Sequence, residues 1–80
     1  MQIVMVKFSL DQLAQKEHGN VVGFLPELKS LSRLLSFGLL PGCPVTMLQN
    51  SGTQSLLLEA RGMKIALDRF EAQKIQIVKS

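Results

Sequence analysis

The chain has 80 residues, a net charge of +3 and a hydrophobic content of 46%, so residues 1–80 are expected to form one globular domain. A single cysteine and a single histidine exclude a scaffold held by disulfides and the usual four-ligand zinc site. Glycines and prolines interrupt the uncharged run between Leu34 and Glu59, so we expect no membrane insertion. The chain begins without a basic leader region, and the expected location is the cytoplasm.

The N-terminal part is predicted to contain short strands around one helical turn. Residues 1–8 form an extended segment that would add an edge strand. Ser9 and Gln12 have capping-box spacing, which predicts a helical turn after Ser9. Residues 15–20 are polar and are expected to form a loop. The sequence VVGFL at 21–25 is typical of a strand, and Gly23 within it indicates a bulge.

A helix is predicted over residues 27–37. Pro26 and Glu27 suit its first turn, because proline is tolerated there and a carboxylate favours the positive end of the helix dipole. Gly38 is a natural helix end, and Pro41 prevents continuation. The expected apolar stripe consists of Leu28, Leu31, Leu34 and Leu35.

The C-terminal half is predicted to contain four strands and a second helical turn. The strands are expected at residues 45–48, 56–60, 63–67 and 74–78. Gly62 closes a tight hairpin between the second and third of them. Met63, Ile65 and Leu67 alternate with polar or small residues and are assigned to one buried face. Asp68 begins another capping box, which predicts a one-turn helix before the last strand.

Short strands and tight turns together predict a mainly β fold. We expect a small SH3-like β-barrel of about five strands with the helix at 27–37 inserted, because closure removes exposed strand edges. The predicted partner-binding surface consists of Phe37, Leu39, Leu40 and Leu57. Leu39→Glu is therefore expected to weaken partner binding without loss of folding. The alternative, that all of these leucines pack into the core, stays open.

Reactive residues are scarce, so we expect neither catalysis nor a cofactor. The carboxylates form no close pair on one predicted face, and the glycines are dispersed rather than gathered in a phosphate loop. Cys43 is interpreted as a half-buried turn residue and His18 as an exposed loop residue. A catalytic pairing of Cys43 with His18 is disfavoured, as is weak metal binding by His18, Glu17 and Asp11. The scattered basic residues and four phenylalanines also argue against a nucleic-acid partner.

Three runs of sequence resemble the FeoA family over most of the chain. Residues 33–45 (RLLSFGLLPGCPV) resemble its signature at the helix exit, residues 60–75 (ARGMKIALDRFEAQKI) resemble its second motif, and residues 9–13 (SLDQL) resemble its opening. The signature positions that serve turns in this sequence are Gly38, Pro41, Gly42 and Gly62.

The resemblance implies an SH3-like barrel that assists or regulates FeoB, the ferrous iron transporter with a GTPase domain. Contact with the cytoplasmic part of FeoB would be the mode of action. The alternatives are a C-terminal SH3-like domain of a metal-dependent repressor and a small nucleic-acid-binding barrel. A repressor needs a helix-turn-helix domain, for which 80 residues leave no room.

Two departures from the family pattern bear on the expected partners. An uncharged loop at 49–55 replaces the basic link found in most relatives, which puts any contact through this loop in doubt. The additional segment at 1–8 offers either an edge strand or a surface for weak homo-oligomer formation.

Overall fold

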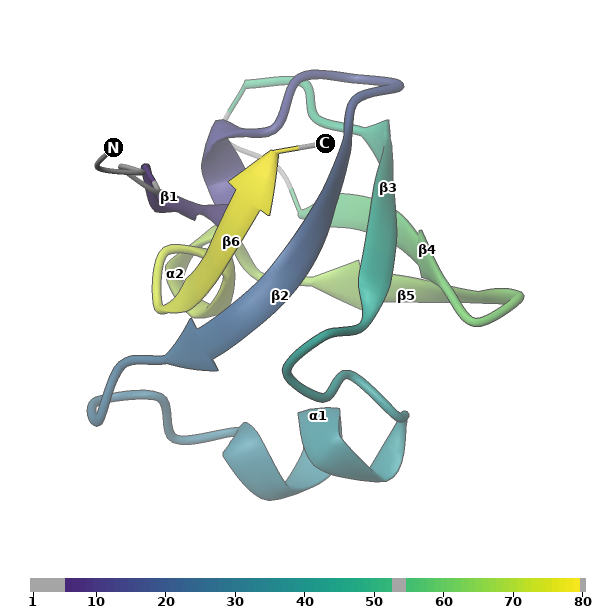
Figure 1. The fold of residues 1–80 in the computed structure, drawn as a ribbon. Coiled ribbons are helices and arrows are strands. Elements are labelled where there is room, and N and C mark those ends of the chain that lie inside the picture. Colours follow the sequence, from purple (N-terminus) through teal and green to yellow (C-terminus); the bar gives the residue numbers. More distant parts are fainter. Residues whose placement is uncertain (1–5, 53–54, 80) are drawn as a thin grey trace, which may run out of the picture.

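Six strands form one antiparallel sheet in the order β1-β6-β2-β3-β4-β5 in the computed structural model, which describes residues 6–52 and 55–79 (Figure 1). The elements are β1 (Phe8–Ser9), the 3₁₀ turn η1 (Leu10–Gln12), β2 (His18–Phe24), α1 (Leu31–Ser36), β3 (Pro44–Gln49), β4 (Leu56–Ala60), β5 (Met63–Leu67), α2 (Arg69–Ala72) and β6 (Ile75–Lys79). The mainly β prediction is confirmed. The sixth strand is the additional edge strand expected from the N-terminal segment, and it consists of Phe8 and Ser9, which pair with β6. The part of the predicted first strand at residues 1–5 lies outside the described residues.

Strand β2 is the centre of the sheet and begins three residues earlier than predicted. Its first residues, His18 to Asn20, pair with β3 and were expected to be loop. Glycine at position 19 allows the close approach of β6 to β2. Any larger residue would place its Cβ 2.9 Å from the Val78 carbonyl oxygen of β6. Backbone pairing on both sides therefore outweighs the polar character of this stretch. The expected irregularity near Gly23 is present as a register shift between β2 and β6.

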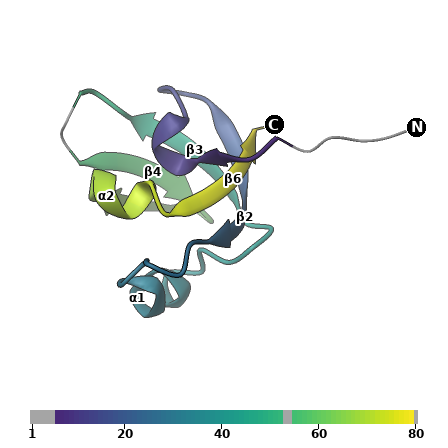
Figure 2. The same cartoon turned by 90° about the vertical axis from the view of Figure 1, so that its left-hand side faces the viewer.

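Helix α1 is shorter than the predicted 27–37 helix. Residues before Leu31 form turns instead, and the Leu28 amide donates to the Leu25 carbonyl at 3.1 Å. This turn places the Leu28 side chain in the core. The predicted helix end near Phe37 is confirmed, since Gly38 has φ +86 and starts the connection to β3. As Figures 1 and 2 show, α1 lies to one side of the sheet rather than across its face.

Both capping boxes are formed. The Ser9 amide donates to Gln12 Oε1 at 2.8 Å ahead of η1. In α2 the Phe70 amide donates to Asp68 Oδ1 at 2.8 Å, and the Asp68 amide donates to Glu71 Oε1 at 3.2 Å. These local hydrogen bonds fix where the two short helices begin.

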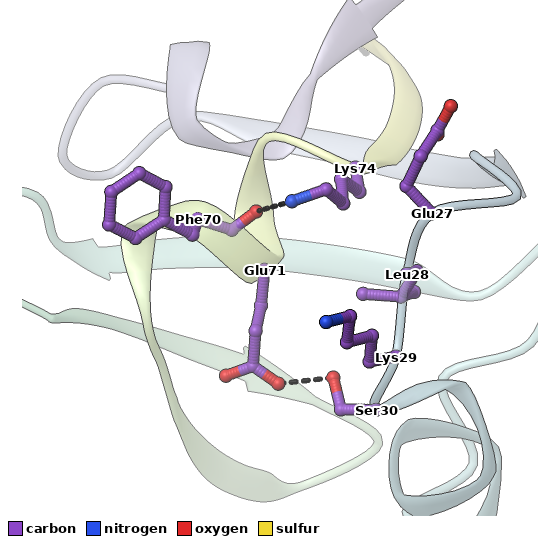
Figure 3. A pocket seen from close by; sticks show the side chains of 7 residues that line it. All are labelled: Glu27, Leu28, Lys29, Ser30, Phe70, Glu71 and Lys74. Carbon is purple, nitrogen blue, oxygen red and sulfur yellow. Dashed lines mark hydrogen bonds between the residues drawn. The ribbon is translucent and has the colours of Figure 1, made fainter.

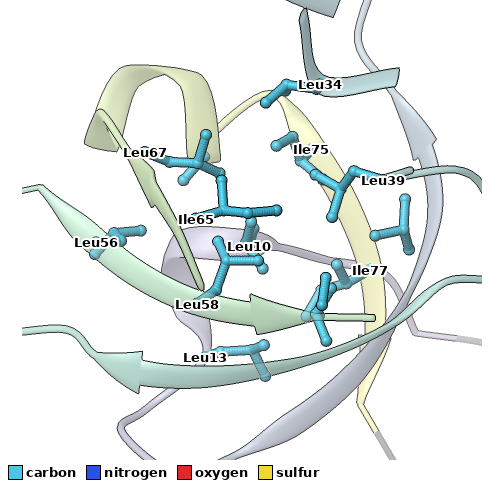
Figure 4. Close-up of a cluster of buried hydrophobic side chains, with 14 of the residues drawn as sticks. Leu10, Leu13, Leu34, Leu39, Leu56, Leu58, Ile65, Leu67, Ile75 and Ile77 are labelled. Carbon is cyan, nitrogen blue, oxygen red and sulfur yellow. The ribbon is translucent and has the colours of Figure 1, made fainter. Parts of the chain in front are cut away.

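One apolar core lies inside the curved sheet and is closed by η1, α1 and α2 (Figure 4). No polar or charged side chain is buried in the part of the chain that the structure describes. The core residues are Leu10, Leu13, Val21, Leu28, Leu34, Leu39, Cys43, Val45, Met47, Leu56, Leu58, Ala60, Ile65, Leu67, Ala72, Ile75 and Ile77.

Candidate partner-binding site

The reactive residues of the sequence do not converge. His18 lies exposed on β2 rather than in a loop, with Nδ1 2.9 Å from Thr46 Oγ1. Cys43 is buried, and its thiol donates to the Pro44 carbonyl oxygen at 3.4 Å. Within residues 6–52 and 55–79, no three His, Cys, Asp or Glu side chains are grouped to hold a metal ion. The features that remain for a functional site are exposed apolar and charged side chains.

The prediction that Leu39 belongs to the partner-binding surface is wrong, whereas Phe37 and Leu40 are exposed as predicted. The Leu39 side chain is 0% exposed and lies in the core, whereas Phe37 is 37% and Leu40 46% exposed. The Gly38 amide donates to Leu35 and the Leu39 amide to Leu34, which is the hydrogen-bond pattern of a Schellman motif. This motif turns the residue after the glycine back onto the helix, so Leu39 is buried together with Leu34.

Leu57 lies half-buried on the sheet face opposite to Leu56 and Leu58, as the strand alternation predicts. Its cross-strand partner is Ala66 of β5, which is exposed. Because directly paired residues share a sheet face, Leu57 and Ala66 lie side by side.

A groove lies between α1 and β5, and we call it the α1–β5 groove. It has a volume of about 380 Å³ and is lined by Arg33, Phe37, Met63, Lys64, Ile65 and Ala66. Ile65 is buried and belongs to the core. Met63 is 42% exposed, so its expected place on the buried face of β5 is wrong: it is the first residue after the Gly62 turn.

The charges on the lining of the α1–β5 groove are all positive. Arg33 contributes from α1 and Lys64 from β5, and no carboxylate lines the groove. A third basic residue, Arg61, packs over Gly38: a Cβ on Gly38 would lie 3.0 Å from Arg61 Cδ. Gly38 is therefore favoured by its positive φ, and the Arg61 side chain of the β4–β5 turn occupies the space next to its missing Cβ.

A second hollow, the α2 pocket, lies between α2 and the segment that precedes α1 (Figure 3). It has a volume of about 330 Å³ and is lined by Glu27, Leu28, Lys29, Ser30, Phe70, Glu71 and Lys74. Phe70 is the most exposed of the described phenylalanines, at 70%. Two acidic and two basic side chains balance each other, so the α2 pocket lacks the one-sided charge of the α1–β5 groove.

Glu71 joins α1 to α2 between the two hollows. Its Oε2 accepts from Arg33 Nη2 at 2.8 Å and also from the Ser30 hydroxyl, while its Oε1 caps α2. Partial burial alone would raise the pKa of the Glu71 carboxyl. The hydrogen bonds from Ser30 and the Asp68 amide, together with the Arg33 guanidinium, outweigh this and lower the pKa below its usual range.

Acidification is expected to weaken this junction. Because the folded-state pKa of Glu71 is lowered, its ionised form stabilises the fold above the unfolded-state pKa, about 4.3, and the contribution is lost as the pH falls through the folded-state value. The urea midpoint of the wild type should therefore fall more steeply below about pH 5 than that of Glu71→Gln. Parallel curves for the two proteins would contradict a role for the Glu71 charge.

The antiparallel sheet, the helix inserted between β2 and β3 and the one-turn helix before the last strand define a small SH3-like domain. The FeoA domain model matches residues 8–79, and the chain therefore belongs to the FeoA domain family. A search of curated proteins found no match. No helix in the described residues is long and apolar enough to cross a membrane.

Solved structures share this fold at low sequence identity. An iron uptake regulatory protein (FeoA) is 21% identical with a TM-score of 0.84, covering 95% of this chain and 100% of that one. A FeoA-like protein from Clostridium acetobutylicum is 21% identical with a TM-score of 0.79, covering 94% and 87%. A manganese-dependent transcriptional repressor is 15% identical with a TM-score of 0.85, and the match covers 98% of this chain but 44% of the repressor.

Asn50, in the loop at 49–55 that departs from the family pattern, makes long-range hydrogen bonds that no local sequence pattern indicates. Its Nδ2 donates to the carbonyls of Asp11 at 3.0 Å and Leu13 at 2.7 Å. Its Oδ1 accepts from Arg69 Nη2 at 2.6 Å. The start of the loop therefore ties η1 to α2, and residues 53–54 lie outside the described part.

Proposed function

We propose that this protein is a non-enzymatic accessory or regulatory protein of ferrous iron uptake. It acts in the cytoplasm by contact with the cytoplasmic, GTPase-containing part of a FeoB-type transporter. Membership of the FeoA domain family supports the link to iron transport. The exposed apolar side chains around the α1–β5 groove carry the proposal of a protein contact, because such a surface is suited to a partner rather than to a reaction.

The proposed contact surface consists of Phe37, Leu40, Leu57 and Met63. Phe37 and Met63 line the groove, and Leu57 adjoins it through Ala66. Leu40 follows in the connection between α1 and β3 and is exposed. Large side chains in a partly enclosed hollow are the ones that contribute most to protein contacts.

A calorimetric titration against the cytoplasmic part of the FeoB encoded in the same genome tests this surface. We expect saturable binding that Phe37→Ser weakens at least about fivefold, because the phenylalanine forms one wall of the groove. Phe70→Ser in the α2 pocket is the matched control and is expected to leave binding within about twofold. Circular dichroism of both variants checks that they are folded.

Two results would count against the proposal. One is the absence of binding together with unchanged GTP hydrolysis and unchanged ferrous iron uptake in a strain that lacks the protein. The other is equal weakening by Phe37→Ser and Phe70→Ser, which would remove the α1–β5 groove as the contact.

A regulatory domain of a metal-dependent repressor is the second candidate. The similarity to the manganese-dependent repressor favours it, although that match covers less than half of the repressor. The mass of the native polypeptide distinguishes the two functions, because a repressor carries its DNA-binding domain in the same chain. A native mass near 8.8 kDa supports the transport function.

A further inference from the structure

We propose that the α1–β5 groove takes an extended, acidic segment of a partner protein, which pairs with β5 as an additional strand. This deepens the proposed function and rests on it for the identity of the partner. The chemistry of the segment follows from three features of the groove: a free strand edge, exposed apolar walls and an excess of positive charge.

The first feature is the edge of β5. In the described residues β5 is the last strand of the sheet and pairs only with β4. Outside this pairing, the described residues make no backbone hydrogen bond to β5. A strand with one unpaired edge presents a row of amides and carbonyls that another extended chain can satisfy.

The second feature is the shape of the apolar surface along this edge. Phe37 lines the groove from the end of α1, Met63 from the start of β5, and the buried Ile65 follows Met63 two residues later in the strand. A volume of about 380 Å³ suffices for apolar side chains of a peptide. Because side chains alternate along a strand, every second residue of an added segment would face the groove.

The third feature is charge. The charge of Arg33 is met by Glu71, but Lys64 and Arg61 form no ion pair within the described residues. Glu59 lies opposite Lys64 in the β4–β5 register without forming one. An added segment with carboxylate side chains would complement these two cations.

The same charges disfavour a second copy of this chain as the occupant. Lys64 is the second of the five residues of β5, so two β5 strands paired antiparallel about this residue would place the Lys64 side chains of both copies opposite each other. Like charges placed opposite each other destabilise a strand pair. The groove therefore fits an acidic partner segment rather than self-association.

Selection of short random peptides on the immobilised protein tests the inference without the transporter. Enriched peptides are expected to combine acidic and aliphatic residues and to slow hydrogen exchange of β5 amides. Lys64→Glu should weaken a selected peptide at least about tenfold, since it reverses the charge beside the bound strand. Lys29→Glu in the α2 pocket is the matched control, with a change below about twofold.

Several outcomes would overturn the inference. In the selection, these are enrichment of neutral or basic peptides or no enrichment at all. In the binding measurements, they are equal affinity of Lys64→Glu and Lys29→Glu for a selected peptide, and full affinity for a peptide whose alternate amides are N-methylated. Preferential binding of a single-stranded oligonucleotide, or a dimer sensitive to Lys64→Glu, would also overturn it. If peptides bind as expected but the transporter does not, the proposed partner fails and the groove chemistry stands. If the transporter binds at another surface than β5, the proposed strand pairing is wrong and the proposed function stands.

Discussion

Leu39→Ala is expected to lower the free energy of unfolding by about 3 kcal/mol, whereas Leu40→Ala should change it by less than about 0.5 kcal/mol. The two leucines are adjacent, but Leu39 is fully buried and Leu40 is nearly half exposed. Truncation of Leu39 leaves a cavity beside Leu34, and truncation of Leu40 leaves none. For a domain of this size the loss at Leu39 corresponds to a fall in Tm of about 12–24 °C.

Urea denaturation followed by far-UV circular dichroism measures both variants, because the chain has no tryptophan or tyrosine to report by fluorescence. Similar losses for Leu39→Ala and Leu40→Ala would contradict the assignment of Leu39 to the core. In the binding titration, Leu40→Glu should weaken partner binding while the protein stays folded. Leu39→Glu should instead prevent folding, because it buries an unpaired carboxylate.

Asn50→Ala is expected to lower the free energy of unfolding by about 2–3 kcal/mol, because it removes three hydrogen bonds at once. The carbonyls of Asp11 and Leu13 lose their side-chain donor, and Arg69 loses its acceptor. The lost acceptor is costly for Arg69, because its buried Nε already has no hydrogen-bond partner in the described residues. Thermal unfolding monitored by circular dichroism provides the measurement.

Gln49→Ala is the matched control, because Gln49 is exposed and directly precedes Asn50. It should change the free energy of unfolding by less than about 0.5 kcal/mol. Asn50→Asp keeps an acceptor for Arg69 but places a carboxylate oxygen against the Asp11 and Leu13 carbonyls in place of their donor, so it should also lower the free energy of unfolding. A loss at Asn50→Ala no larger than that at Gln49→Ala would rule out this tie between η1 and α2.

The α1–β5 groove is held in shape at both ends of α1. Ser30 and Arg33 are bound by Glu71 at the start of the helix, and the Schellman motif around Gly38 fixes its end. Arg61 adds a contact from the β4–β5 turn to Gly38. A groove whose walls are fixed before binding loses less conformational entropy on complex formation.

The sequence by itself determined the elements whose signals are local. The predicted strands at 56–60 and 63–67 have the observed bounds of β4 and β5, and both capping boxes form at Ser9 and Asp68. Gly38, Gly42 and Gly62 adopt positive φ as their turns require. These features depend on hydrogen bonds and backbone conformations within a few residues, so short patterns carry them.

Only the tertiary structure decided which apolar residues reach the surface. Met63 follows the alternation of β5, but its side chain lies beyond the edge of the core and is exposed. The tertiary structure also decided that His18 belongs to a strand, because β3 pairs with it. The burial of Leu39 does have a local signal, because an apolar residue directly after a helix-ending glycine is typical of a Schellman motif and packs back onto the helix. Asn50 had no such signal, because its three partners lie 19 to 39 positions away in the sequence. Burial and long-range hydrogen bonds depend on which elements pack together, and that is set by the whole core rather than by any one segment.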